Sequence, residues 1–247
     1  MIVTFVLLLI FGWALGSALN YLADVLPFTR SFSSPVCQHC GSDLTFREYA
    51  LYKPCPNCTE ARGTRTWVIL ILAILCTPLV YFFPPERFGF WISLPYLFYF
   101  ALIALIDIEH RVILRETILA GLVITIPIGI MWNGWINTLL GALVGFGAMT
   151  GTYYLGVLFN RIASKKRGVP IEEVAFGYGD VNLSAILGIF LGWPKIGIGL
   201  FVSIMLAGLL SGFYVVISLI GRKYQAFTAI PYAPFLVFSA VILLYLA

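Results

Sequence analysis

The sequence predicts an all-α integral membrane protein with about eight transmembrane helices and a small polar module between the first and the second. Hydrophobic residues make up 61% of the 247 residues and charged residues only 11%, whereas soluble domains are about 45–50% apolar and about 25% charged. The 15 basic and 11 acidic residues are too scattered to form the dense phosphate-binding surface that nucleic-acid binding requires. We therefore expect membrane lipid around the chain and no nucleic acid as a partner.

Apolar segments bounded by charged residues and prolines divide the chain into its expected helices. The first begins without the basic residues of a cleaved signal peptide, so it is expected to remain as a membrane helix. The sixth is short because Gly192-Trp193-Pro194 interrupts it, a length typical of buried or re-entrant segments. The eight segments are residues 2–22, 67–83, 88–106, 112–131, 136–159, 181–193, 196–220 and 230–247.

The basic residues predict how these helices cross the membrane. The first, third, fifth and seventh connections together hold thirteen Lys and Arg residues, and the second, fourth and sixth hold two. By the positive-inside rule the odd-numbered connections are cytoplasmic, and both termini lie outside.

Glycines recur four residues apart in the later helices, a spacing that lets membrane helices approach closely. Such pairs are typical of tight packing within one bundle or of an interface that moves, and the spacing does not distinguish the two. The pairs are Gly141 and Gly145, Gly147 and Gly151, Gly188 and Gly192, and Gly208 and Gly212.

The long polar stretch at residues 28–66 contains Cys37, Cys40, Cys55 and Cys58 in the pattern C-x2-C-x14-C-x2-C. Two such knuckles provide the four thiolates that Zn²⁺ prefers. Two disulfides or a redox pair are the alternative, but disulfides rarely persist in the cytoplasm, where the charge count places this loop. Four thiolates leave no open coordination position, so the predicted zinc is structural.

Two aspartates stand at helix ends expected on the same membrane face. Asp107 ends the third apolar segment, and Asp180 begins the sixth after Gly177 and Gly179. Two carboxylates that lie close cannot both ionise easily, so one retains a proton while the other activates water, as in aspartic proteases. The alternative is that Asp180 caps its helix and Asp107 marks a membrane boundary.

These features in combination resemble the type IV prepilin peptidase family, whose members are membrane aspartic proteases with a Gly-x-Gly-Asp motif. The resemblance rests on Asp107 with the following Ile-Glu-His-Arg, on the sequence from Gly177 to Val181, on the four-cysteine loop and on the stretch from Pro231 to Leu236. It implies catalysis by Asp107 and Asp180, with Gly177 and Gly179 supporting the catalytic loop. The implied substrates are prepilins or pseudopilins, cut after a short basic leader at the cytoplasmic face of a bacterial-type inner membrane.

The resemblance also implies three parts: a first transmembrane helix at residues 1–27, a cytoplasmic zinc-binding loop at 28–66 and a seven-helix protease core at 67–247. Many relatives carry Leu-Pro-Asp or Ile-Pro-Asn where this chain has Ile113-Leu114-Arg115. Bifunctional relatives, which methylate with S-adenosylmethionine, carry Asn-Ile-Pro and Arg-Tyr-Pro-x-x-Glu stretches that are missing here. We therefore predict leader cleavage with methylation weak or absent.

Two other functions fit the same residues. The aspartates could relay protons in a transporter, which carboxylates halfway along helices would favour. Alternatively, the chain could bind pilins as a non-catalytic assembly factor, although it retains both aspartates. Neither the oligomeric state nor the particular prepilin follows from the sequence.

Overall fold

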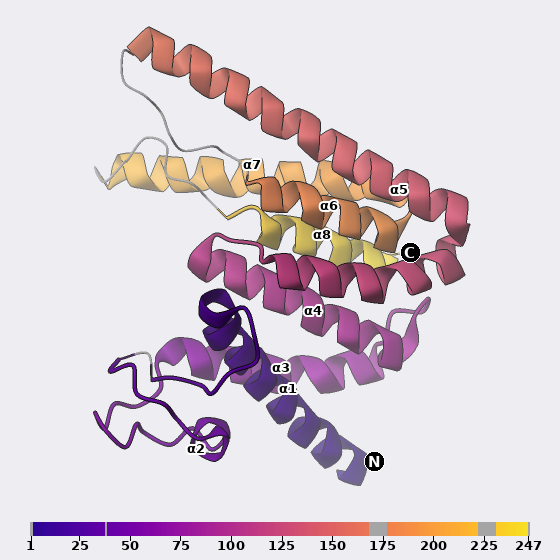
Figure 1. The fold of residues 1–247 in the computed structure, drawn as a ribbon. Coiled ribbons are helices and arrows are strands. Elements are labelled where there is room, and N and C mark those ends of the chain that lie inside the picture. The colour runs from indigo at the N-terminus through magenta and orange to yellow at the C-terminus, as the bar shows by residue number, and fades with distance from the viewer. Residues whose placement is uncertain (1, 38, 168–176, 222–230, 247) are drawn as a thin grey trace. The chain divides into compact units, whose positions relative to one another are not determined.

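The computed structural model describes residues 2–37, 39–167, 177–221 and 231–246, and the regular elements of these residues are helices. The all-helical fold is therefore confirmed. One isolated β-bridge joins Val36 and Asp43 in the cysteine loop. The helices (Figure 1) are α1 (Ile2–Thr29), α2 (Phe46–Ala50), α3 (Thr64–Phe82), α4 (Gly89–His110), α5 (Arg115–Arg167), α6 (Tyr178–Leu191), α7 (Lys195–Ile220) and α8 (Ala233–Leu246).

Helix α5 contains two of the predicted segments. Its helical geometry breaks at Gly134, where φ is 75° and ψ is 160°, a conformation that glycine adopts without the steric cost of a Cβ atom. Figure 1 shows the chain turning back at this point, so that α5 consists of two arms. The arms correspond to the segments expected at 112–131 and 136–159. The short helix α2 was not among the expected segments and belongs to the cysteine loop.

The chain is a multi-pass membrane protein. In the part of the chain that the structure describes, five helices are long and apolar enough to cross a bilayer, namely α1, α3, α4, α5 and α7. Helices α6 and α8 are shorter apolar helices of 14 residues each. It remains a prediction that the two arms of α5, α6 and α8 each cross the membrane separately. The orientation of the helices in the membrane also remains a prediction.

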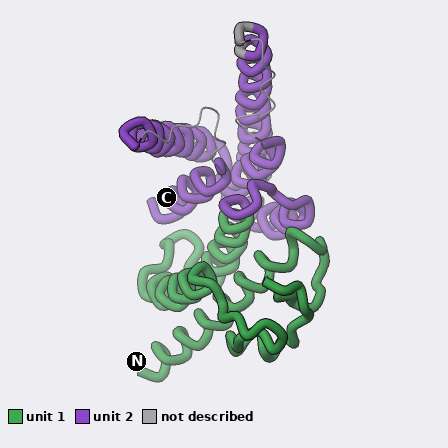
Figure 2. The backbone as a smooth tube through the Cα atoms, turned by 90° about the vertical axis from the view of Figure 1, so that its left-hand side faces the viewer, with its two compact units in different colours: residues 1–106 green, residues 107–247 purple. Residues whose placement is uncertain are grey.

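Two compact units make up the chain, residues 1–106 and residues 107–247 (Figure 2). In the first unit α1 packs along α3. A Cβ atom on Gly12 would lie 2.8 Å from the Cα of Ile74, so this glycine allows the two backbones to approach closely. Leu8, Val80, Phe90 and Leu94 form an apolar cluster that joins α1, α3 and the start of α4.

In the second unit α6 is the central helix. It contacts α5, α7 and α8, and nearly every residue from Asp180 to Leu191 is buried, which confirms the expectation of a short buried helix. A Cβ atom on Gly141 or Gly188 would collide with the carbonyl oxygen of the other residue. Cβ atoms on Gly145 and Gly192 would also lie within 3 Å of other atoms, so tight packing is confirmed for the pairs Gly141–Gly145 and Gly188–Gly192. Cβ atoms on the other two predicted pairs, Gly147–Gly151 and Gly208–Gly212, would meet no atom within 4 Å.

Candidate active site and metal centre

Asp107 lies in the last turn of α4 with only 5% of its surface exposed. Its Oδ2 atom accepts a hydrogen bond of 3.2 Å from the backbone N–H of Ala233, the first residue of α8. A contact between residues so far apart in sequence means that tertiary packing, not the local turn, positions this carboxylate.

Asp180 lies in the first turn of α6 and is 7% exposed. Its Oδ2 atom accepts the Gly177 N–H over 3.0 Å, which satisfies a free amide at the helix start. The predicted capping role of Asp180 is therefore confirmed. A Cβ atom on Gly179 would lie 2.9 Å from the Cβ of Ile113, which explains the glycine at that position.

The two carboxylates belong to the same unit and lie near enough for the charge of Asp107 to act on Asp180. The structure thus brings together the ends of α4 and α6 that the sequence marked. Two buried carboxylates in electrostatic contact can share one proton, so that one is an acid while the other is a base. Both lie near helix ends and neither is halfway along an apolar helix.

The four predicted cysteine ligands also come together. Their Sγ atoms all lie within 4.8 Å of one another, with 3.7 Å between Cys37 and Cys58 and 3.6 Å between Cys40 and Cys55. A disulfide requires about 2.05 Å, whereas four sulfurs about 2.3 Å from one tetrahedral zinc ion lie about 3.8 Å apart. The thiols are free, and their spacing fits a metal ion.

The surroundings of the cysteines bear on their charge. A hydrogen bond with the Ser42 hydroxyl, followed by bonds with the backbone of Cys58 and Asn57, lowers the pKa of the Cys55 thiol to about 6. Although a backbone bond with Glu60 opposes it, burial together with the other three thiols raises the pKa of Cys58 to about 12. A cation among the four sulfurs would favour the thiolate form of each.

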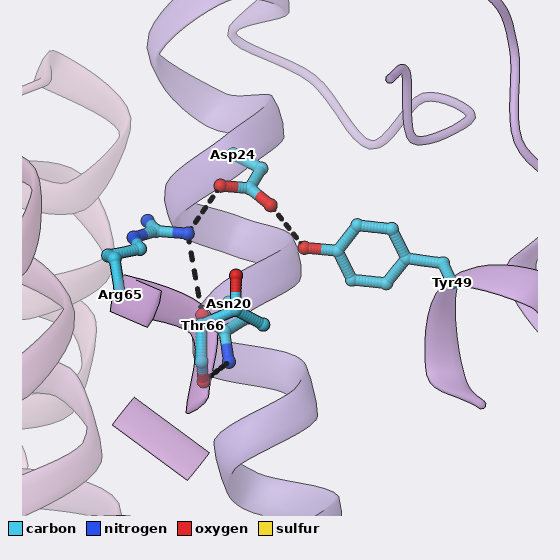
Figure 3. Close-up of polar contacts among 5 residues, drawn as sticks. All are labelled: Asn20, Asp24, Tyr49, Arg65 and Thr66. Atoms are coloured by element: carbon cyan, nitrogen blue, oxygen red, sulfur yellow. Dashed lines mark hydrogen bonds and ion pairs between the residues drawn. The ribbon is translucent and has the colours of Figure 1, made fainter. Parts of the chain in front are cut away.

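A buried polar cluster joins the cysteine loop to α1 and α3 (Figure 3). Arg65 donates to Asp24 over 2.6 Å, the Tyr49 hydroxyl donates to the other carboxylate oxygen of Asp24, and Asn20 donates to the carbonyl of Thr66 over 3.2 Å. Burial, the negative charge of Asp24 and the hydrogen bond to it raise the pKa of Tyr49. Tyr49 therefore remains a proton donor well above neutral pH.

Sequence reasoning missed several of these partners. Ala233 acts through its backbone, for which no side-chain pattern exists. The Tyr232 hydroxyl, just before α8, and the Ser203 hydroxyl of α7 share a 2.9 Å hydrogen bond. The stretch from Pro231 to Leu236 was the available signal, and it carried no role by itself. Asn20 and Asp24 were recognisable as neighbours on one helical face, but their bonds to α2 and α3 were not.

Comparison with known proteins agrees with this geometry. Residues 94–216, which contain both aspartates, match the type IV leader peptidase family. A prepilin leader peptidase/N-methyltransferase of Myxococcus xanthus is 31% identical over 216 residues, covering 80% of this chain and 59% of that protein. Proteins of the same name from Aeromonas hydrophila and Legionella pneumophila are 24% and 25% identical, covering 90% and 96% of this chain and 74% and 89% of their own lengths.

The chain spans less than two thirds of the length of the Myxococcus protein. No solved structure matches it. The similarity nevertheless extends over most of this chain and covers the two helix ends that hold the buried aspartates. The chain therefore belongs to the type IV leader peptidase family.

Proposed function

We propose that this chain is a membrane aspartic endopeptidase in which Asp107 and Asp180 are the catalytic residues. The observation that carries the proposal is the pairing of two buried carboxylates at the end of α4 and the start of α6, each held by one backbone amide. The charge of Asp107 acts on Asp180, which fits a division of acid and base roles between two equivalent side chains. Membership of the family adds independent support.

The chemistry follows from this pair. The ionised carboxylate accepts a proton from water as the water oxygen attacks the scissile carbonyl carbon, and the protonated carboxyl stabilises the resulting oxyanion by hydrogen bonding. Collapse of the tetrahedral intermediate breaks the C–N bond, and the leaving nitrogen receives a proton from the pair. The protons balance within the pair, whose apparent pKa values belong to both residues together.

The proposed substrates are prepilins or pseudopilins with a short basic leader. A substrate of this kind is an apolar helix whose leader stays on the cytoplasmic side. The excess of Lys and Arg in the odd-numbered connections supports a cytoplasmic position for the end of α4 and the start of α6. Gly177, just before α6, and Gly179, in its first turn, are proposed to leave room for the peptide backbone of the substrate to reach the carboxylates.

For the cysteine module we propose structural zinc. The sulfur distances and the donor set of four thiolates fit this ion. Cys37, Cys40, Cys55 and Cys58 would hold it, and the ion would stabilise a polar loop that has a small apolar core.

Methylation by S-adenosylmethionine is proposed to be weak or absent. The basis is the sequence: no Asn-Ile-Pro stretch stands between the two cysteine pairs, and residues 59–67, after the pairs, contain no equivalent of the Arg-Tyr-Pro-x-x-Glu stretch that bifunctional relatives share. The matching proteins carry N-methyltransferase in their names, so the proposal needs its own test. Transfer of a labelled methyl group to purified mature pilin would contradict it.

Leader cleavage can be tested with purified protein in liposomes and a prepilin that carries a basic leader and a glycine before the cut. Mass spectrometry would compare the wild type with Asp107→Asn, Asp180→Asn and the matched control Asp43→Asn, which changes an exposed aspartate of the cysteine loop. We expect each catalytic variant to lose at least about 10²-fold in rate and the control to cleave normally.

The outcome separates the alternatives. Retained cleavage in either folded catalytic variant would reject the proposed roles. Absence of cleavage by the wild type across several prepilins, with intact pilin binding, would indicate an assembly factor. Proton-coupled uptake that depends on both aspartates would indicate a transporter.

A further inference from the structure

Asp107 stands where a helix does not favour a negative charge. It lies in the last turn of α4, and the C-terminal end of a helix carries partial negative charge from unsatisfied carbonyl groups. Asp180 has the opposite position, because it lies in the first turn of α6 and caps that helix through Gly177. Asp107 therefore needs a donor from outside its own helix.

Helix α8 provides that donor. The N–H of Ala233, the first residue of α8, points to Oδ2 of Asp107 over 3.2 Å, and both residues are buried. The start of a helix has free amide groups and partial positive charge. Each aspartate thus accepts one amide hydrogen bond at a helix start, Asp180 from its own helix and Asp107 from α8.

The start of α8 is itself braced against α7. The Ser203 hydroxyl donates its one proton to the carbonyl of Leu200 over 2.8 Å. The Tyr232 hydroxyl shares a hydrogen bond of 2.9 Å with the same Ser203 oxygen. The Tyr232 carbonyl accepts the amide of Phe235 over 3.0 Å, so the residue with the braced side chain also begins the helix that presents the Ala233 amide.

We propose that the Ala233 N–H, held in place by the Tyr232–Ser203 hydrogen bond, is a positioning group that orients the ionised carboxylate of Asp107 for peptide hydrolysis. The inference rests on the proposed endopeptidase activity. Among the described residues, the charged groups that act on or with this carboxylate are Arg111, just beyond α4, and Asp180 of α6, and the Tyr232 hydroxyl lies within electrostatic reach of Asp180.

The backbone donor can be removed by Ala233→Pro. Proline has no N–H, and it is tolerated at the first position of a helix. Ala233→Gly is the matched control because it keeps the N–H. Tyr232→Phe removes the brace without adding atoms, so it tests the same arrangement if the proline variant does not fold.

We expect Ala233→Pro to lower kcat about 10- to 100-fold, the effect of a lost hydrogen bond to a charged group, with KM unchanged. The acidic limb of the pH–rate profile should move to higher pH, since the ionised carboxylate of Asp107 loses a donor. Tyr232→Phe should produce a smaller change of the same kind, and Ala233→Gly should match the wild type.

A second readout does not depend on cleavage. In hydrogen–deuterium exchange, Asp107→Ala should accelerate exchange of the Ala233 amide, and Asp180→Ala should leave it unchanged. Unchanged exchange in Asp107→Ala, or a folded Ala233→Pro variant with the rate and pH profile of the wild type, would overturn the inference. Lower rates in both Ala233→Pro and Tyr232→Phe without a shifted profile would also overturn it, by indicating a purely structural role. Failure of the wild type to cleave any prepilin would instead reject the proposed function.

Discussion

The guanidinium of Arg65 lies 2.6 Å from the carboxylate of Asp24, and this ion pair connects the start of α3 with the end of α1. Asp24 is 8% exposed, and its other oxygen accepts the Tyr49 hydroxyl from α2. One carboxylate therefore connects α1, the helix α2 within the cysteine loop, and α3, which follows that loop.

Substitution of Asp24 by alanine should destabilise the first unit by about 3 kcal/mol, because the buried Tyr49 hydroxyl and the Arg65 guanidinium lose their shared acceptor. Reversible unfolding in mixed micelles would measure the change. Asp43→Ala, at an exposed position of the same loop, should change stability by less than about 0.5 kcal/mol. Equal effects of the two substitutions would show that the ion pair adds no stability.

The raised pKa of Tyr49 predicts that the stability of the folded protein decreases at alkaline pH. Its pKa is raised in the folded protein by burial and by Asp24, so the unfolded chain loses the phenol proton first, near pH 10. The stability that this difference provides is complete below about pH 10 and decreases as the pH rises further. Unfolding midpoints between pH 8 and 11 should therefore fall in the wild type more steeply than in Tyr49→Phe. Parallel curves would contradict the prediction.

Removal of the metal should unfold the cysteine module. The buried core of this module contains Leu44 and Tyr49 beside Cys37 and Cys55, so it forms around the sulfur cluster. Elemental analysis should find one zinc ion per chain, and Cys55→Ser should lower that content and make residues 28–66 sensitive to protease. Cys76→Ser, in α3 outside the cluster, is the control and should keep the full zinc content.

The close contact between α5 and α6 at Gly141 and Gly188 predicts that substitutions of different glycines will differ in their effect on stability and activity. Gly188→Ala would place a methyl group against the carbonyl oxygen of Gly141, and overpacking of this kind costs about 1–3 kcal/mol. We expect lower thermal stability and slower leader cleavage, because α6 carries Asp180. Gly147→Ala, which meets no atom within 4 Å, should leave both unchanged. If both variants have the thermal stability and the cleavage rate of the wild type, the close contact between α5 and α6 does not hold α6 in place.

Sequence patterns were most informative where the spacing of residues along the chain determines which side chains can act together at a site. The two C-x2-C knuckles predicted a metal cluster, and the sulfur atoms do converge. The Gly-x-Gly-Asp stretch and Asp107 predicted a pair of carboxylates at helix ends, and the pair is present. The apolar segments also predicted a break between residues 131 and 136, where the helical geometry is interrupted at Gly134. The partners of Asp24 had no comparable signal, since an aspartate near a loop occurs in many contexts.

The amino-acid sequence by itself determined the helical, membrane-embedded character of the chain, its cysteine cluster and its two key aspartates. Hydrophobicity, ligand type and spacing act locally along the chain, so they can be recognised before folding. Only the tertiary structure decided that Ala233 donates to Asp107, that Arg65 and Tyr49 share Asp24 and that Gly141 meets Gly188. These contacts join distant segments through backbone atoms and buried polar groups, and their partners depend on how the helices pack.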